Sequence, residues 1–281
     1  MSDKQKIRKA VFPVAGFGSR FLPVTKAMPK ELIPILNKPL IQYAAEEAID
    51  AGIDTLIFVT GRNKRSIEDH FDANNELEAA LRASGKEVQA DMVRNILPSG
   101  VECIFVRQPE QLGLGHAVLC AERVVGEDAF AVLLADDFIT DQIPGATADL
   151  INAYHVNGKS QLSVMEVDGP DISKYGVIVP NEDGTGIIGL NEKPKLEDAP
   201  SKLASIGRYV LTSDIFDILR DISIGSGGEI QLADAINIQA KRGFVNTVRI
   251  KGKRFDYGSV NGFVEATNFE FKKFTASSKI F

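Results

Sequence analysis

Three cations and two glycines lie close together near the start of the 281-residue chain. Arg20, Lys26 and Lys30 fall within eleven residues, and Gly16 and Gly18 stand just before them. Glycine lets a backbone turn tightly and bare its amide groups, which together form a concave anion site. Several prolines in the same segment favour an extended loop. A cationic, glycine-opened loop of this kind is suited to holding a nucleoside triphosphate.

Other phosphate-binding motifs fit this loop less well. A dinucleotide fingerprint requires a third glycine at the start of a helix, but this chain has Phe21 there, and Pro23 disfavours a helix. The G-x-x-x-x-G-K-[ST] motif is absent from the loop. These departures disfavour a dinucleotide-dependent oxidoreductase. Taken alone, the loop could still be a connector without a ligand.

Two aspartates are candidate metal ligands. Asp136 follows the apolar run Phe130–Leu134, and Asp256 lies in the sequence Arg254–Gly258. Mg²⁺ prefers oxygen ligands and commonly uses one or two carboxylates together with phosphates and water. An aspartate at a strand end can equally be a helix cap or a turn residue. The residues alone therefore leave a metal site and a structural role both open.

A glutamine and a glycine-opened turn form a candidate base site. Gln108 follows the apolar run Val101–Val106, and its amide offers the donor and the acceptor that match the imide edge of uracil. The turn Gln111–Ala117 comes next and contains Gly113. His116 lies in the same turn, where a structural role at a helix start is favoured over acid–base catalysis.

Glu192 and Lys193 form a further polar pair, followed by a proline. A carboxylate can accept from sugar hydroxyls, and a lysine is a point charge suited to a phosphate. Without other information, a solvated polar turn explains this pair better than a binding site does.

Apolar runs alternate with amphipathic segments, which predicts an α/β fold with a Rossmann-like mixed, mostly parallel sheet flanked by helices. Ligands bind such sheets at the carboxyl ends of the strands. In the first half we expect strands at Ala10–Val14, Thr55–Thr60, Val101–Val106 and Phe130–Leu134, and helices at Ile41–Ala51, Arg65–Phe71 and Gly115–Val124. The polar segment Glu76–Leu97 is expected to be an inserted helical excursion.

The second half is expected to be rich in strands. They are predicted at Gln161–Val167, Val177–Val179, Ile187–Leu190, Ala204–Leu211 and Val245–Ile250, with helices at Ser213–Arg220, Ile230–Lys241 and Gly262–Phe271. We expect one domain over residues 1–281, with a nucleotide-binding half at about 8–140, a sugar-phosphate half at about 141–268, and a tail at 269–281. The residues from Lys272 show no pattern, which indicates poor order or a role in assembly.

Composition narrows the possible partners. The net charge is −6, which argues against a nucleic-acid-binding protein, since these usually carry a basic face. No apolar run has the length of a membrane span, and no signal-peptide pattern is found. Cys103 and Cys120 lie in apolar runs without metal-ligand spacing and are predicted to be buried. Together these features predict a cytoplasmic protein.

The loop from Pro13 to Leu32 closely resembles the signature of the sugar-1-phosphate nucleotidylyltransferases, and in particular of the bacterial UTP–glucose-1-phosphate uridylyltransferases. The resemblance extends from about Arg8 to about Asn268, with further motifs in order. It implies transfer of a uridylyl group from UTP to glucose 1-phosphate, with UDP-glucose and pyrophosphate as products. It also implies Mg²⁺ as cofactor and assembly as a homodimer or homotetramer.

The resemblance also assigns roles to individual residues. Arg20, Lys30 and Lys193 are expected to act in catalysis through the phosphates, and Asp136 and Asp256 are expected to bind the metal. Nucleotide binding is implied for Ala15, Gly16, Gly18, Gln108 and Gly113, and sugar-phosphate binding for Gly176, Glu192 and Lys193.

Two departures from the family pattern occur near the predicted site. Ala233 replaces a threonine of the family's E-[IL]-Q-L-T-D-A segment, and Val260 stands where many relatives have a lysine. The alternatives are a glucose-1-phosphate thymidylyltransferase, which shares the loop and the metal aspartate, and a catalytically silent regulatory paralogue. The long insertion and the Gln108–Ala117 stretch favour the uridylyl branch, and the presence of every predicted cation and carboxylate argues against a silent paralogue.

Overall fold

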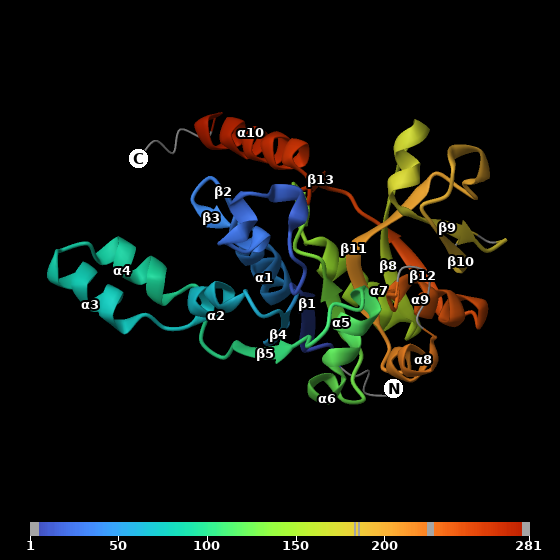
Figure 1. Ribbon diagram of the computed structural model, residues 1–281, viewed down its shortest axis with the longest axis horizontal. Helices are drawn as coiled ribbons and strands as arrows, with labels where there is room; N and C mark the ends of the chain where they lie inside the picture. The colour runs from blue at the N-terminus through green and yellow to red at the C-terminus, as the bar shows by residue number, and fades with distance from the viewer. Residues whose placement is uncertain (1–5, 183, 185, 224–227, 277–281) are drawn as a thin grey trace.

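The computed structural model describes residues 6–182, 184, 186–223 and 228–276 (Figure 1). Within these residues, a central sheet of nine strands runs through the molecule. Seven of them lie side by side in the order β10 (Ile187–Glu192), β9 (Gly176–Pro180), β11 (Leu203–Leu211), β6 (Phe130–Leu133), β1 (Lys9–Pro13), β4 (Thr55–Thr60) and β5 (Glu102–Arg107). β8 (Ser160–Glu166) pairs with β11, and β12 (Val245–Arg249) pairs with β8.

The sheet changes character between the two halves of the chain. β1 pairs in parallel with β4 and β6, and β4 pairs in parallel with β5. β11 runs antiparallel to β6, β8 and β9, and therefore joins the first half of the chain to the second. The predicted mixed sheet flanked by helices is confirmed.

Helices cover both faces of the sheet because successive side chains of a strand point to opposite sides. On one face, Val11 of β1 packs in a cluster with residues of α5 (Leu114–Cys120), α8 (Ile215–Asp221) and α9 (Leu232–Lys241). On the other face, Ala10 and Phe12 pack with residues of α1 (Leu40–Asp50), α2 (Arg65–Phe71) and α7 (Ala146–Asn157). The result is a three-layer α/β/α arrangement.

A smaller hydrophobic cluster packs the N-terminal loop against the segment around Tyr257 and the last helix of the described chain. Phe21 and Ile35 pack in this cluster with Phe138, Tyr257 and Ala266. These residues come from the loop, from β2 (Pro34–Ile35), from β7 (Asp137–Thr140), from the residue after β13 (Lys253–Asp256) and from α10 (Val260–Ala276). β2 pairs with β3 (Lys38–Pro39), and β7 pairs with β13. The cluster brings the cationic loop close to the strand that ends in Asp256.

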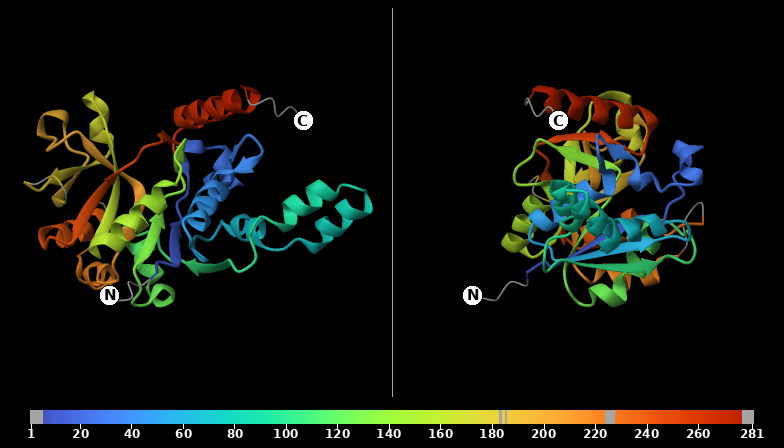
Figure 2. Two further views of the ribbon diagram at one scale, coloured as in Figure 1. Left: turned by 180° about the vertical axis from the view of Figure 1, so that it is seen from behind. Right: turned by 90° about the vertical axis from the view of Figure 1, so that its left-hand side faces the viewer.

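The predicted helical excursion forms a hairpin of α3 (Asn75–Ala83) and α4 (Glu87–Arg94), which projects away from the sheet (Figures 1 and 2). Arg82 stabilises the hairpin through ion pairs with Glu78, Glu87 and Asp91. None of the helices in the described part of the chain has the length and apolar content that a bilayer crossing requires.

Several sequence predictions need correction. The loop is not extended but folds into three short 3₁₀ turns at Ser19–Phe21, Val24–Lys26 and Lys30–Leu32, since the φ that proline imposes also suits a 3₁₀ turn. The predicted helix Gly115–Val124 is divided at Ala121 into α5 and α6 (Glu122–Val125).

The tail and the cysteines also differ from expectation. α10 continues to Ala276, so most of the tail is helical, and residues 277–281 lie outside the described part of the chain. Cys103 and Cys120 are half-buried rather than buried, and both are free thiols. The helix α7 and the short strands β7 and β13 were not predicted at all.

Candidate active site

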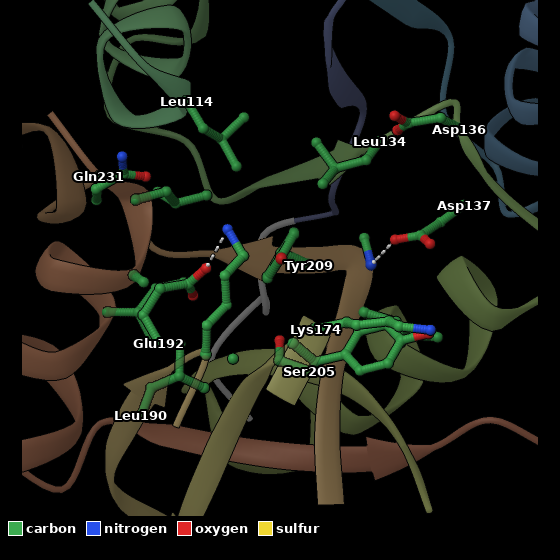
Figure 3. Close-up of a pocket in the computed structure, with 18 of the residues that line it drawn as sticks. Leu114, Leu134, Asp136, Asp137, Lys174, Leu190, Glu192, Ser205, Tyr209 and Gln231 are labelled. Atoms are coloured by element: carbon green, nitrogen blue, oxygen red, sulfur yellow. Dashed lines mark hydrogen bonds and ion pairs between the residues drawn. The ribbon is translucent and has the colours of Figure 1, made fainter. Parts of the chain in front are cut away.

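Two adjoining cavities lie where strands of the sheet end. The smaller, of about 290 Å³, is lined by residues that follow β1, β5 and β6 and by the turn into α5. The larger, of about 480 Å³, is lined by residues of β9, β10, β11 and α9 (Figure 3). Leu114, Leu134 and Asp136 line both cavities. Asp136 therefore lies at the junction, where ligands in the two cavities would meet.

Asp136 is paired with a lysine of the cationic loop from Pro13 to Leu32. Lys30 donates from Nζ to Asp136 Oδ2 over 2.5 Å. Burial alone would raise the pKa of Asp136, but the Lys30 ammonium outweighs this effect and holds the pKa below its usual range. Burial likewise opposes the charge of Lys30, yet Asp136 and Glu31 raise its pKa. Both groups are therefore ionised near neutral pH.

Three predicted site residues converge on Gly258. A β-carbon added to this glycine would lie 2.9 Å from Asp136 Oδ2, 3.1 Å from Asp256 Oδ1 and 3.3 Å from Arg20 Nη2. The two carboxylates and the guanidinium, from three distant segments, thus surround one point beside Gly258. This is the juxtaposition that the sequence could not establish from spacing.

Asp137 has a different environment from its neighbour. Its Oδ2 accepts from the Gly207 N–H over 2.6 Å, and its Oδ1 is ion-paired with Arg254. Arg254 also donates to the Tyr175 hydroxyl over 2.7 Å. Asp137 is 7 % exposed and lines the larger cavity, and its contacts join β7 to β11 and β13 at the cavity wall.

Four of the five predicted nucleotide-binding residues line the smaller cavity, namely Ala15, Gly16, Gln108 and Gly113. Gly18 does not line it. Its carbonyl accepts from Thr25 Oγ1 over 2.8 Å, and a β-carbon on it would meet the Lys30 β-carbon at 3.1 Å. Gly18 also has a φ of +67°, which favours glycine, so it shapes the loop behind Lys30.

The predicted sugar-phosphate residues line the larger cavity. Gly176, Glu192 and Lys193 all contribute to its wall, and the Lys193 ammonium lies 3.3 Å from Glu192 Oε1. Lys193 has a φ of +46°, an uncommon value for a residue other than glycine. Its N–H donates to the Tyr175 carbonyl, which holds this turn beside β9. Lys193 is thus held in a strained conformation of the kind found at functional sites.

Some residues of the site were not found from the sequence. Lys174, Tyr209, Gln231 and Arg254 also line the larger cavity. Of these, Lys174 lies two residues before the predicted site residue Gly176, and that position was the available signal. Gln231 lies in the segment that resembles E-[IL]-Q-L-T-D-A, and Arg254 lies in the sequence Arg254–Gly258. Neither residue had a predicted role.

A buried ion pair between the cationic loop and the segment after β4 was also missed. Lys64 donates to Glu31 Oε2 over 2.7 Å, and the two residues are 5 % and 2 % exposed. Burial raises the pKa of Glu31 and lowers that of Lys64, because the pairing offsets only part of the desolvation. Glu31 lines the smaller cavity beside Lys30, so this pair ties the loop to the segment after β4.

Comparisons with known proteins show the family of this chain. The family model described as nucleotidyl transferase matches residues 9–273. A Pseudomonas aeruginosa protein named UTP–glucose-1-phosphate uridylyltransferase is 46 % identical over 98 % of this chain and 100 % of its own length. A Staphylococcus saprophyticus protein, UTP–glucose-1-phosphate uridylyltransferase 1, is 47 % identical over 93 % of this chain and 92 % of its own.

Solved structures give the same result. A UDP-glucose pyrophosphorylase complexed with UDP-glucose superposes with a TM-score of 0.85 at 46 % identity, covering 95 % of this chain and 99 % of that one. A UTP-bound UGPase from Acinetobacter baumannii has a TM-score of 0.87 at 39 % identity, covering 97 % and 100 %. Fold and cavities together define an α/β protein with two adjoining cavities at the ends of its strands. The chain belongs to the nucleotidyl transferase family.

Proposed function

We propose that this protein transfers a uridylyl group from UTP to glucose 1-phosphate and releases UDP-glucose and pyrophosphate. The names of the relatives support this reaction, as do the solved relatives that hold UTP and UDP-glucose. The observation that carries the proposal is the position of Asp136 at the junction of the two cavities. A nucleotide in the smaller cavity and a sugar phosphate in the larger one would bring their reacting phosphates together there.

The reaction requires positioning and charge neutralisation rather than a general base. Its nucleophile is a phosphate oxygen of glucose 1-phosphate, which is already ionised near neutral pH. In this proposal Lys193 holds that phosphate, Lys30 contacts the α-phosphate of UTP, and Arg20 contacts the β- and γ-phosphates. These cations favour in-line attack by holding the two substrates in register and by stabilising charge on the leaving pyrophosphate.

A divalent metal fits the point beside Gly258 that Asp136 and Asp256 share. Asp136 and Asp256 would hold Mg²⁺, since two carboxylates with room for phosphate oxygens suit that ion. No cluster of three or more acidic, histidine or cysteine ligands occurs among the described residues, so phosphates and water would complete the shell. When bound, the ion stabilises charge on the transferred and leaving oxygens. Lys30 would then share Asp136 with the metal.

The remaining binding roles are also proposals. Ala15, Gly16, Gln108 and Gly113 would contact the nucleotide, with Gln108 facing the uracil, while Gly18 shapes the loop. Gly176 and Glu192 would contact the glucose. We also expect a homodimer or homotetramer in the cytoplasm, and analytical ultracentrifugation would test the oligomeric state.

A pyrophosphate-release assay tests the reaction. The protein should release pyrophosphate when given UTP, glucose 1-phosphate and Mg²⁺, and much less when dTTP replaces UTP. Equal turnover with dTTP would favour the thymidylyl alternative. No release with any pair from a panel of nucleoside triphosphates and sugar 1-phosphates would indicate a silent paralogue.

A further inference from the structure

The side-chain amide of Gln108 has a fixed orientation. Its Nε2 lies 3.1 Å from the Gly113 carbonyl oxygen. A carbonyl can only accept, so the nitrogen of the amide, and not its oxygen, must face Gly113. The same carbonyl accepts from the Ala117 N–H in the first turn of α5, which holds it in place. The backbone at the start of this helix therefore holds one of the two hydrogens of the Gln108 amide.

His116 engages the other amide hydrogen. Its Nδ1 lies 3.1 Å from Gln108 Nε2, and since the amide nitrogen donates, Nδ1 must accept. The ring is then neutral, with its hydrogen on Nε2, which lies 3.9 Å from the Cys120 sulfur. Gly113 and His116 together use both hydrogens of the amide. Gln108 is left with Oε1, an acceptor, as its one hydrogen-bonding atom for a ligand.

We propose that His116 is a specificity-determining residue, which locks Gln108 as an acceptor and thereby selects bases that carry an N–H at N3. Uracil and thymine have this N–H, whereas cytosine presents a lone pair at N3 that Oε1 repels. The inference rests on the proposed function, in which Gln108 faces the base. His116 lines neither the smaller nor the larger cavity, so it is a positioning residue that acts through Gln108.

Nucleotide binding to two His116 variants tests this role. Calorimetry would give the dissociation constants of UTP, CTP and 5-methyl-UTP for the wild type, His116→Leu and His116→Asn. Leucine leaves Nε2 held by the Gly113 carbonyl alone, so the amide can turn and donate its other hydrogen to cytosine N3, and the preference for UTP over CTP should fall about tenfold. The ratio of UTP to 5-methyl-UTP should not change, because both bases carry the N3 hydrogen. Asparagine supplies an acceptor in place of Nδ1 and should keep the wild-type preference.

Three results would overturn the inference. A wild type that binds CTP as tightly as UTP shows that no such selection exists. If His116→Leu binds all three nucleotides more weakly by the same factor, His116 has a purely structural role. His116→Phe provides a second variant should the leucine protein fail to fold. An asparagine variant that behaves like the leucine variant shows that the acceptor is not what matters. Because binding is measured directly, these results do not depend on turnover, and the pyrophosphate assay tests the proposed function separately.

Discussion

Arg208 and Glu47 form a buried ion pair between β11 and α1, across 161 positions of sequence. The Arg208 guanidinium is 2 % exposed and donates to both carboxylate oxygens of Glu47, at 2.9 to 3.2 Å. Glu47 also accepts from the N–H and the hydroxyl of Thr147 at the start of α7. One carboxylate thus connects a helix of the first half to the strand that joins the halves.

Glu47→Gln should destabilise the protein by about 3–5 kcal/mol near neutral pH, because the buried Arg208 charge loses its partner. Burial opposes ionisation of Glu47, but Arg208 outweighs it and lowers the pKa below the ordinary 4.5. A carboxylate with a lowered pKa stabilises the fold above 4.5 and loses that contribution as the pH falls through its folded value. Urea unfolding at several pH values should therefore show the difference from wild type shrinking below pH 4.5.

Glu46→Gln is the matched control, since Glu46 lies on the same helix but pairs with Lys38 in a partly exposed position. Its cost should stay within about 1 kcal/mol. A Glu47 variant as stable as this control would contradict a supporting role for the pair.

The single domain that the sequence predicts has its own test. β11 pairs with β6 and β8, so the halves share one sheet and should unfold together. When hydrogen exchange is measured at increasing urea concentrations, the amides of β4 and β8 should lose their protection in one transition. Two separate transitions would indicate two domains.

Lys193→Ala should weaken the binding of glucose 1-phosphate far more than the binding of UTP. A charge-assisted contact contributes roughly 1.5–3 kcal/mol, so the KM for glucose 1-phosphate should rise about ten- to a hundredfold. Lys195→Ala is the control, because Lys195 is a nearby exposed lysine that does not line the larger cavity. Equal losses for both substrates would count against the assignment of Lys193.

Arg20→Ala should reduce uridylyl transfer by roughly two orders of magnitude, as expected when a donor to developing negative charge is removed. Arg20 is exposed, so melting temperature and circular dichroism should match the wild type. Arg65→Ala, whose side chain is 87 % exposed and lines neither the smaller nor the larger cavity, should leave both activity and stability unchanged. Near-normal activity of Arg20→Ala would make it an ordinary surface residue.

The sequence predicted those parts of the structure that depend on neighbouring residues. β4 and α2 begin and end where their apolar patterns do, and most predicted ligands line the cavities. α7 was missed because few of its residues, among them Leu150 and Ile151, are both apolar and buried. β7 and β13 were missed because each has only four residues.

Long-range pairs lie outside what spacing can predict. Nothing in the sequence around Asp137 indicates that Arg254 is its partner, and nothing around Glu47 indicates Arg208. These contacts depend on how distant strands meet, and a buried charge looks like a surface charge in a linear sequence. The convergence of Asp136 and Asp256 was available only through the family resemblance.

The last prediction separates the neighbouring aspartates. Asp136 faces the junction of the cavities and is paired with Lys30, whereas Asp137 is paired with Arg254 and bound to Gly207. Asp136→Asn should abolish most of the activity, because the metal loses a charged ligand. The activity that remains should require a higher Mg²⁺ concentration. Asp137→Asn should lower the melting temperature, since Arg254 loses its partner, but keep activity within about tenfold, or roughly 1.4 kcal/mol on the barrier. Mg²⁺ titrations and thermal melts of both variants decide between them. If Asp137→Asn is stable but inactive and Asp136→Asn remains active, the metal site has been assigned to the wrong carboxylate.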